Sequence, residues 1–237
     1  MNAATVATQD KRTYWVADDF TVRLLEGITP RRVSSHAVEQ FLSSATATSL
    51  EAFTYEQDGH FFYVLSAVEG TFVLDVITGE WAERETYLQG NWSMRYSAQF
   101  NGLELVGDAT SNKIGSLDAN TYTDFGATQR MEWTYQPIYA EQRQAFHRRL
   151  EVVLETGVGA TTGQGSDPKI MCQYSDDGGR TFKSLPDKSL GPLGNREVRV
   201  TWHGLGSARQ RVYKMAVSDP VAIAVTDTQI EVDGGRL

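Results

Sequence analysis

The feature that most constrains the fold is a recurring pattern of two short apolar runs separated by a turn dipeptide. In FTYEQDGHFFYVLS, two aromatic-rich runs flank Asp58-Gly59, and in SAQFNGLELVGD two runs flank Asn101-Gly102. Such dipeptides supply the positive φ angles of a tight hairpin turn. GTFVLDVITGEWAER has the same form around Thr78-Gly79. The pattern therefore predicts a series of β-hairpins.

These hairpins recur at a fixed spacing. Gly59 and Gly102 are 43 residues apart, and the pairs Leu74-Asp75 and Leu117-Asp118 have the same separation. A spacing of about 40–50 residues is typical of four-stranded propeller blades. We therefore expect residues 1–130 to form two to three propeller-like β-blades, which would make an incomplete propeller.

One helix interrupts the strands. In SSHAVEQFLSS (34–44), a serine can cap the first turn, and four apolar residues fall on one side at helical spacing. These residues are Ala37, Val38, Phe41 and Leu42.

The second half of the chain follows a different pattern. The segment TQRMEWTYQPIYAEQRQ carries a proline and lacks the earlier spacing, and longer strand candidates follow it. Val198, Val200 and Trp202 alternate with polar residues, which is typical of a sheet with one core-facing and one polar side. We expect a β-sandwich over residues 131–237, so the predicted class is all-β: propeller-like blades, one short helix, then the sandwich.

Charge and composition exclude several classes of protein. The net charge is −8, all of it within residues 1–130, which hold 9 basic and 17 acidic residues. An acidic surface does not bind a phosphate backbone tightly, although it could suit a passage through which a polyanion slides. No apolar run approaches the roughly 20 residues of a membrane span, and the N-terminus lacks the apolar core of a signal peptide. The single cysteine, Cys172, excludes an internal disulfide and is expected to be buried.

The stretch YSDDGGRTFKS carries the sharpest local motif. Ser175, Asp177, Gly179 and Phe182 fit the Asp-box pattern Ser/Thr-x-Asp-x-Gly-x-x-aromatic. In this pattern the carboxylate accepts hydrogen bonds across a turn and the glycine takes a positive φ. A calcium loop needs oxygen ligands at alternate positions, which adjacent aspartates do not supply. A catalytic carboxylate pair is also disfavoured, because neighbouring side chains on a turn point apart. We interpret the stretch as a structural turn.

The remaining polar clusters give no catalytic or cofactor site. The sequence contains no serine-nucleophile elbow, no GxxxxGK and no HExxH, and its four histidines are scattered. We therefore expect no enzymatic activity, no cofactor and no metal. Arg148, Arg149, Arg209 and Arg211 are interpreted as solvated strand-face or interface residues, with Arg209 and Arg211 as candidates for a subunit interface.

Taken in order, several phrases resemble one family. Six stretches, in this order, are similar to the packaged-DNA stabilization proteins of short-tailed phages. They are YWVADDFTVRLLEG, GHFFYVL, VLDVITGEWAER, ELVGDATSNKIGSLD, SDDGGRTF and VTWHGLGSARQRVYKMAVSDPVAI. These proteins are also described as tail hub or tail nozzle proteins. The likeness extends over about residues 13–225. Members of this family are roughly twice as long, so the resemblance implies that this chain is a shortened member.

The resemblance implies a structural protein of the virion that is assembled in the bacterial host cytoplasm. Such proteins form homo-oligomeric rings, usually sixfold, below the portal and head-to-tail adaptor. They enclose DNA without sequence-specific binding, close the channel, and contact tail fibres or tailspikes. Two alternatives stay open: a carbohydrate-binding or sialidase-like propeller, suggested by the Asp-box and by the exposed-looking Trp81 and Trp92, and a general β-sandwich adaptor.

Overall fold

The structure is a computed structural model that describes residues 3–139 and 143–234. It divides into two compact units, Met1–Thr121 and Tyr122–Leu237. The division therefore falls somewhat before the boundary after residue 130 that the sequence pattern suggests. Both units consist mainly of antiparallel sheets, with a single α-helix among the described residues, which confirms the all-β class.

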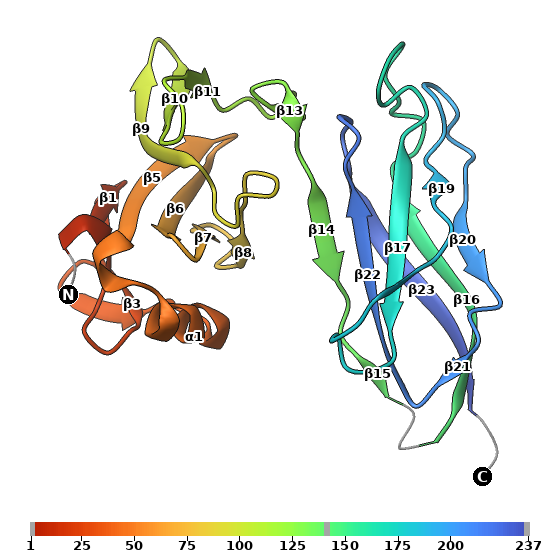
Figure 1. Ribbon diagram of the computed structural model, residues 1–237. Helices are drawn as coiled ribbons and strands as arrows, with labels where there is room; N and C mark the ends of the chain where they lie inside the picture. Colours follow the sequence, from red (N-terminus) through yellow and green to blue (C-terminus); the bar gives the residue numbers. More distant parts are fainter. Residues whose placement is uncertain (1–2, 140–142, 235–237) are drawn as a thin grey trace. The chain divides into compact units, whose positions relative to one another are not determined.

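Unit 1 contains three antiparallel meander sheets that follow one another along the chain (Figure 1). Short 3-10 helices, η1 and η2, precede the first and second sheets. The elements are η1 (Ala3–Thr5), β1 (Ala7–Gln9), β2 (Arg12–Val16), β3 (Val22–Glu26) and β4 (Thr29–Arg32); then η2 (Ala47–Ser49), β5 (Glu51–Gln57), β6 (His60–Ala67), β7 (Gly70–Asp75) and β8 (Trp81–Glu83); then β9 (Met94–Phe100), β10 (Leu103–Asp108) and β11 (Ile114–Ser116).

The predicted hairpin turns are confirmed. Asp58 and Gly59 connect β5 to β6 with φ angles of 52° and 79°, and Asn101 and Gly102 connect β9 to β10 with φ angles of 50° and 76°. Both dipeptides occupy the left-handed region that a two-residue hairpin turn of this type requires.

The first strands of the three sheets lie side by side. β1 contacts β5, and β5 contacts β9. The Thr54 hydroxyl is 3.3 Å from Gln9 Oε1, and the Ser97 hydroxyl donates to the carbonyl of Thr54. These polar contacts connect three sheets that are separated by about one repeat each in the sequence.

Two apolar cores separate the sheets of unit 1. The core between the first and second sheets includes Tyr14, Val22, Tyr63 and Leu65, all at most 1% exposed. The core between the second and third sheets includes Phe53, Tyr55, Val73, Trp92 and Val106. Each fully buried aliphatic or aromatic side chain contributes about 1.5–3 kcal/mol to the free energy of folding. The two cores therefore hold the three sheets in this order.

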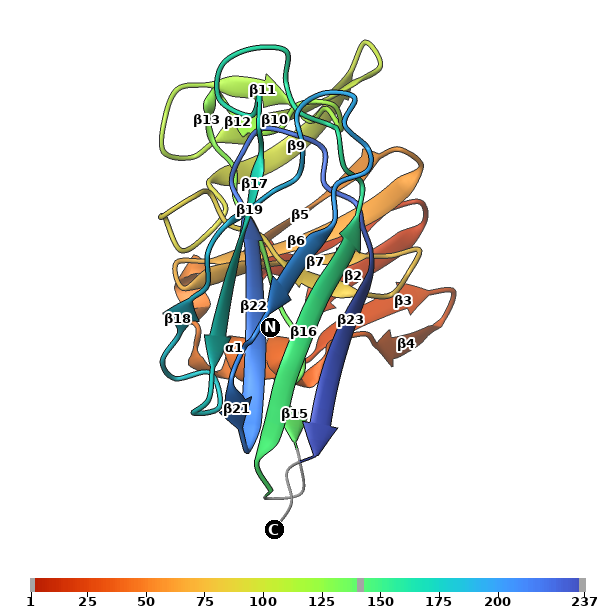
Figure 2. The same ribbon diagram turned by 90° about the vertical axis from the view of Figure 1, so that its right-hand side faces the viewer.

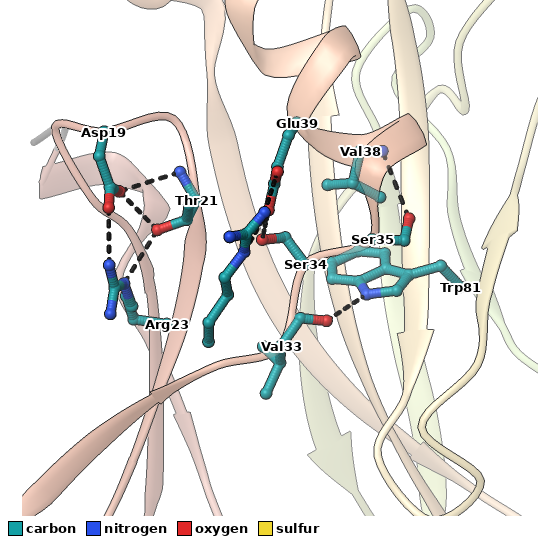
Figure 3. A network of polar contacts seen from close by, with 10 residues as sticks. Asp19, Thr21, Arg23, Val33, Ser34, Ser35, Val38, Glu39 and Trp81 are labelled. Carbon is teal, nitrogen blue, oxygen red and sulfur yellow. Dashed lines mark hydrogen bonds and ion pairs between the residues drawn. The ribbon is translucent and has the colours of Figure 1, made fainter.

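The helix α1 (His36–Ser44) lies where the sequence predicts it. The hydroxyl of Ser35 accepts a hydrogen bond from the Val38 amide, and Val38 and Leu42 are buried in the first core. Ala37 is exposed rather than packed, because the buried stripe runs through Val38 and Leu42, one turn apart. Figure 3 shows this cap together with the Trp81 indole, which donates to the Val33 carbonyl ahead of the helix.

Unit 2 is a sandwich of two sheets (Figure 2). One sheet contains β14 (Met131–Thr134), β15 (Ile138–Tyr139), β17 (Lys169–Ser175), β18 (Lys183–Ser184), β19 (Lys188–Ser189) and β22 (Gln210–Val217). The other contains β16 (Ala145–Leu154), β20 (Val200–His203), β21 (Ser207–Ala208) and β23 (Val225–Gly234). A small hairpin of β12 (Thr123–Asp124) and β13 (Ala127–Thr128) precedes them.

The core of unit 2 lies between these sheets. It includes Leu150, Ile170, Trp202 and Met215, with exposed fractions of 3% or less. Cys172 lies in the same core, and burial raises the pKa of its thiol to about 12, so it is a poor nucleophile. The expected alternation holds in β20, whereas in β22 three successive residues, Arg211, Val212 and Tyr213, are all buried.

Candidate functional site

The Asp-box stretch forms the turn after β17. Ser175, the last residue of β17, is buried, and its hydroxyl donates to Asp177 Oδ1 over 2.6 Å and accepts from the Gly179 amide over 2.8 Å. Gly178 and Gly179 have φ angles of 78° and 92°, which a side chain would strain. The chain then returns as β18, which pairs with β17.

Both oxygens of the Asp177 carboxylate are used within the turn. Oδ1 accepts the amides of Arg180 and Thr181, each over 2.9 Å, and Oδ2 accepts the Thr181 hydroxyl over 2.6 Å. The hydroxyls of Ser175 and Thr181, with these amides, hold the pKa of Asp177 well below its ordinary value. The ionised carboxylate is thus saturated by donors from the chain itself.

The neighbouring aspartate points to another element. Asp176 Oδ1 and Oδ2 accept Nε and Nη2 of Arg211 on β22, over 2.6 and 2.9 Å, in a two-bonded ion pair. Arg211 Nη1 also donates to the carbonyl of Leu205 over 2.5 Å. The pair connects the Asp-box turn to β22 through a planar guanidinium, which suits bidentate pairing.

Aromatic rings enclose the Arg211 side chain. The guanidinium carbon lies 4.3 Å from the centre of the Tyr174 ring, and the Tyr213 hydroxyl is 3.0 Å from Nδ1 of His147. Burial, together with the Arg211 charge, lowers the pKa of His147 to about 4, so this histidine is neutral at pH 7. The cluster is a buried polar layer in which each group has a partner.

The arginine prediction is therefore wrong for one residue. Arg211, expected on a solvated face or at an interface, is only 2% exposed, because its charge is paired with Asp176 and stacked on Tyr174 inside the unit. Arg209, the other interface candidate, is exposed before β22. Arg148 and Arg149 form ion pairs with Asp233 and with Glu151, respectively, on the outside of the second sheet.

Phe182 completes the predicted motif. Its ring is partly buried, and Lys214 Nζ of β22 lies 4.4 Å from the ring centre. The aromatic ring thus lies against the side chain of a β22 residue.

Trp92, interpreted as exposed from the sequence, is 4% exposed, because it packs into the core between the second and third sheets beneath Arg84. Trp81 is only half-buried and also contacts the first core. These two indoles do not form an exposed platform for a sugar ring.

Sequence reasoning missed a cavity of about 550 Å³ in unit 2. Its walls come from both sheets and include Met131, Trp133, Tyr135, Ile138, Val225 and Ile230. The Tyr135 hydroxyl accepts from the Trp133 indole over 2.8 Å and lies 2.5 Å from the Thr228 hydroxyl. The unusual density of aromatic residues in MEWTYQPIY is the signal that could have indicated it.

The described residues contain no group of three or more His, Cys, Asp or Glu side chains placed to hold a metal ion. In that same part of the chain, no helix is long and apolar enough to cross a membrane. The geometry of the Asp-box region therefore offers fixed shape and paired charges rather than a free acid, base or ligand set.

Comparison with known proteins adds one match. Residues 131–233 match the family model described as "Bacteriophage P22 Gp10, beta-sandwich", which covers the sandwich of unit 2 and less than half of the chain. No curated protein matches the sequence. The sandwich of unit 2 is thus similar to the beta-sandwich of a bacteriophage protein.

Proposed function

We propose that this protein is a tail hub or nozzle component that closes the DNA channel below the portal and so stabilises the packaged genome. The observation that carries the proposal is the match of the sandwich, residues 131–233, to a phage tail family. The sequence motifs along residues 13–225 occur in the same order as in this class of protein, and several of them lie in unit 1.

The proposed mechanism is mechanical. Each unit is built from antiparallel sheets with buried cores, and residues 1–130 carry the whole net charge of −8. Carboxylates along a channel repel the phosphate backbone, so DNA can pass or rest there without being bound by sequence. No chemical step is required, and we propose that the protein is not an enzyme.

The proposed partners follow from this role. Copies of the chain would assemble as a ring, sixfold if the resemblance extends to stoichiometry, between the adaptor or portal proteins and the tail fibres or tailspikes. Arg209 is a candidate contact with another subunit, because it is an exposed cation directly before β22 of unit 2. The protein would assemble in the bacterial cytoplasm and remain in the virion.

The alternative function, a carbohydrate-binding or sialidase-like propeller, is not favoured. The family match points elsewhere, Trp92 is buried, and both aspartates of the single Asp-box are occupied by intramolecular donors. A glycan array with the purified protein should therefore show no binding.

The test is DNA retention. Particles produced by the phage or prophage that encodes this chain, with the gene deleted, should package DNA but release it, so that nuclease digests the genome. Supplying the intact gene in trans should restore protection, and supplying Arg209→Glu should restore it less well. Deleted particles that retain nuclease-resistant DNA and remain infectious would overturn the proposal.

A further inference from the structure

The sandwich of unit 2 is closed on one side and open on the other. On the closed side, β19 of one sheet contacts β20 of the other, and the inward-facing residues Ile170, Val200 and Trp202 are at most 3% exposed. On the open side, β14 and β23 are the outermost strands of their sheets among the described residues. Their residues Trp133 and Ile230 contact the same core but are only half-buried. The cavity of about 550 Å³ lies between these two strands.

The size and walls of this cavity suit a small organic molecule. Sites for such molecules typically have volumes of about 300–1,000 Å³ and mainly apolar walls with a few polar groups. Here the aromatic residues Trp133, Tyr135 and Tyr213 line the space, together with aliphatic residues such as Ile138 and Val225. Aromatic side chains pack well against another ring, in offset or edge-to-face contact. The body of a matching ligand is therefore apolar and ring-shaped.

The polar groups of the cavity can donate one further hydrogen bond. The Trp133 indole, the Tyr135 hydroxyl and the Thr228 hydroxyl each carry one donor proton. Only two hydrogen bonds join them, one from the indole to Tyr135 Oη and one between the two hydroxyls. Whichever hydroxyl donates to the other, one hydroxyl proton remains, and no other group of the described residues accepts it. A ligand with a hydrogen-bond acceptor would use this proton.

The interior of the cavity carries no charge that would hold an ion. Asp227 is the only charged residue among the described residues that line it. Along β23 it precedes the inward-facing Thr228 and lies opposite the exposed Val153, so its side chain belongs to the outer face of the sheet. An anion or a cation in the cavity would lose its hydration without gaining a counter-charge, which is costly. A neutral acceptor, such as a carbonyl oxygen, carries much less of this cost.

We propose that this cavity binds a neutral organic molecule with an apolar, ring-shaped body and one hydrogen-bond acceptor, such as an aryl ketone. The ring lies against Trp133 and Tyr135, and the acceptor takes the spare proton of the hydroxyl pair formed by Tyr135 and Thr228. The site lies within unit 2, and its occupancy does not depend on the proposed tail function.

The test titrates the full chain with naphthyl methyl ketone and follows the indole N–H resonance of Trp133 by NMR. We expect a saturable shift with one molecule bound per chain. Naphthoate and naphthylmethylammonium, which place an anion or a cation on the same ring system, should each bind at least tenfold more weakly. In isotope-edited infrared spectra, the carbonyl band of the bound ketone should lie below its position in cyclohexane, because a hydrogen bond weakens the carbonyl double bond.

Two valine-to-tryptophan variants locate the site. Val225→Trp fills the cavity and should weaken ketone binding at least tenfold. The matched control is Val153→Trp, which changes a 40% exposed valine on the outer face of the neighbouring strand β16 and should leave binding unchanged. Circular dichroism of each variant verifies that the sheets still form.

The wild-type chain alone can overturn the inference. It would do so by giving no saturable shift of Trp133 up to the solubility limit of the ketone, by binding either ion as tightly as the ketone, or by leaving the carbonyl band at its cyclohexane position. A folded Val225→Trp variant that binds the ketone as well as the wild type would also overturn it. None of these results would bear on the tail assignment, which rests on the family match.

Discussion

The two units solve the same problem of covering a sheet in different ways. In unit 2, two sheets cover each other, and the core between them is closed by long strands such as β16 and β23, which pair along nearly their whole length. In unit 1, three sheets pack in series, with one apolar core between the first and second sheets and another between the second and third. The core of unit 2 is therefore closed by its own two sheets, whereas unit 1 has the form of a repeat array.

The two units also differ in how deeply their ion pairs are buried. In unit 2 the buried guanidinium of Arg211 pairs with the partly exposed Asp176 and so holds the Asp-box turn against β22, and the buried His147 contacts Tyr213. In unit 1 the corresponding pairs, such as Arg23 with Asp19, lie near the surface and contribute less (Figure 3). The largest single-residue effects outside the apolar cores should thus be found in unit 2.

The largest effect is expected from Asp176→Asn, which leaves the buried guanidinium of Arg211 without its counter-charge. Breaking such a pair should destabilise unit 2 by about 3 kcal/mol, near the low end for buried pairs, because Asp176 is partly exposed. Hydrogen exchange of the β17 and β22 amides in denaturant measures the change. The control Asp187→Asn changes an exposed aspartate of the same unit and should leave the exchange rates unchanged. An equal loss of protection in both variants would show that the ion pair does not stabilise unit 2.

A smaller effect is expected within the repeat array. Val73→Ala removes two methyl groups from the core between the second and third sheets and should cost about 2 kcal/mol. Val68→Ala changes a 68% exposed residue in the neighbouring turn and should cost less than about 0.5 kcal/mol. Urea unfolding of the two variants measures the difference. Similar midpoints would show that the sheets of unit 1 are not packed as described.

Acid should distinguish the units. The pKa of His147 is about 4 in the folded protein and about 6.5 when unfolded, so between these values the unfolded state binds more protons. The contribution of neutral His147 to the free energy of unfolding of unit 2 is thus fully present above pH 6.5. This free energy falls as the pH drops toward 4, by at most about 1.4 kcal/mol per pH unit. Burial alone would raise the pKa of Asp108 in unit 1, but hydrogen bonds from Ser111 and Thr110 hold it at about 2. Asp108 therefore stays ionised between pH 4 and 6.5, and we expect the free energy of unfolding of unit 1 to change less in this window.

Urea titrations at pH 7, 5.5 and 4.5 measure this dependence. His147→Gln should flatten it for unit 2, whereas His203→Gln, at an exposed histidine, should leave it in place. A slope that survives His147→Gln would assign the effect to other groups.

The smallest effect is expected at the helix. Ser35→Ala removes the side-chain cap of α1 and should cost about 1 kcal/mol, seen as faster exchange of the first-turn amides. Ser43→Ala, at an exposed position later in the helix, should change the exchange little. Equal exchange in both variants would mean that the cap does not stabilise the helix.

Local features were the ones that could be predicted from the sequence. Asp58-Gly59 and Asn101-Gly102 specify their hairpins through backbone conformation alone, and Ser35 caps α1 through a contact three residues away. The burial of Arg211 could not be predicted in this way, because its partner Asp176 is 35 residues distant and the pairing of β17 with β22 brings them together. The exposure of Ile114 likewise depends on whether another sheet covers its own, which no local pattern records.

The central claim, that this chain is a structural part of a phage tail, is tested most directly by electron cryo-microscopy of virions from the phage that encodes it. The account predicts density for the sandwich of unit 2 in a ring of the tail below the portal, with several copies in each particle. Purified, infectious virions in which neither the density nor mass spectrometry detects the protein would contradict it.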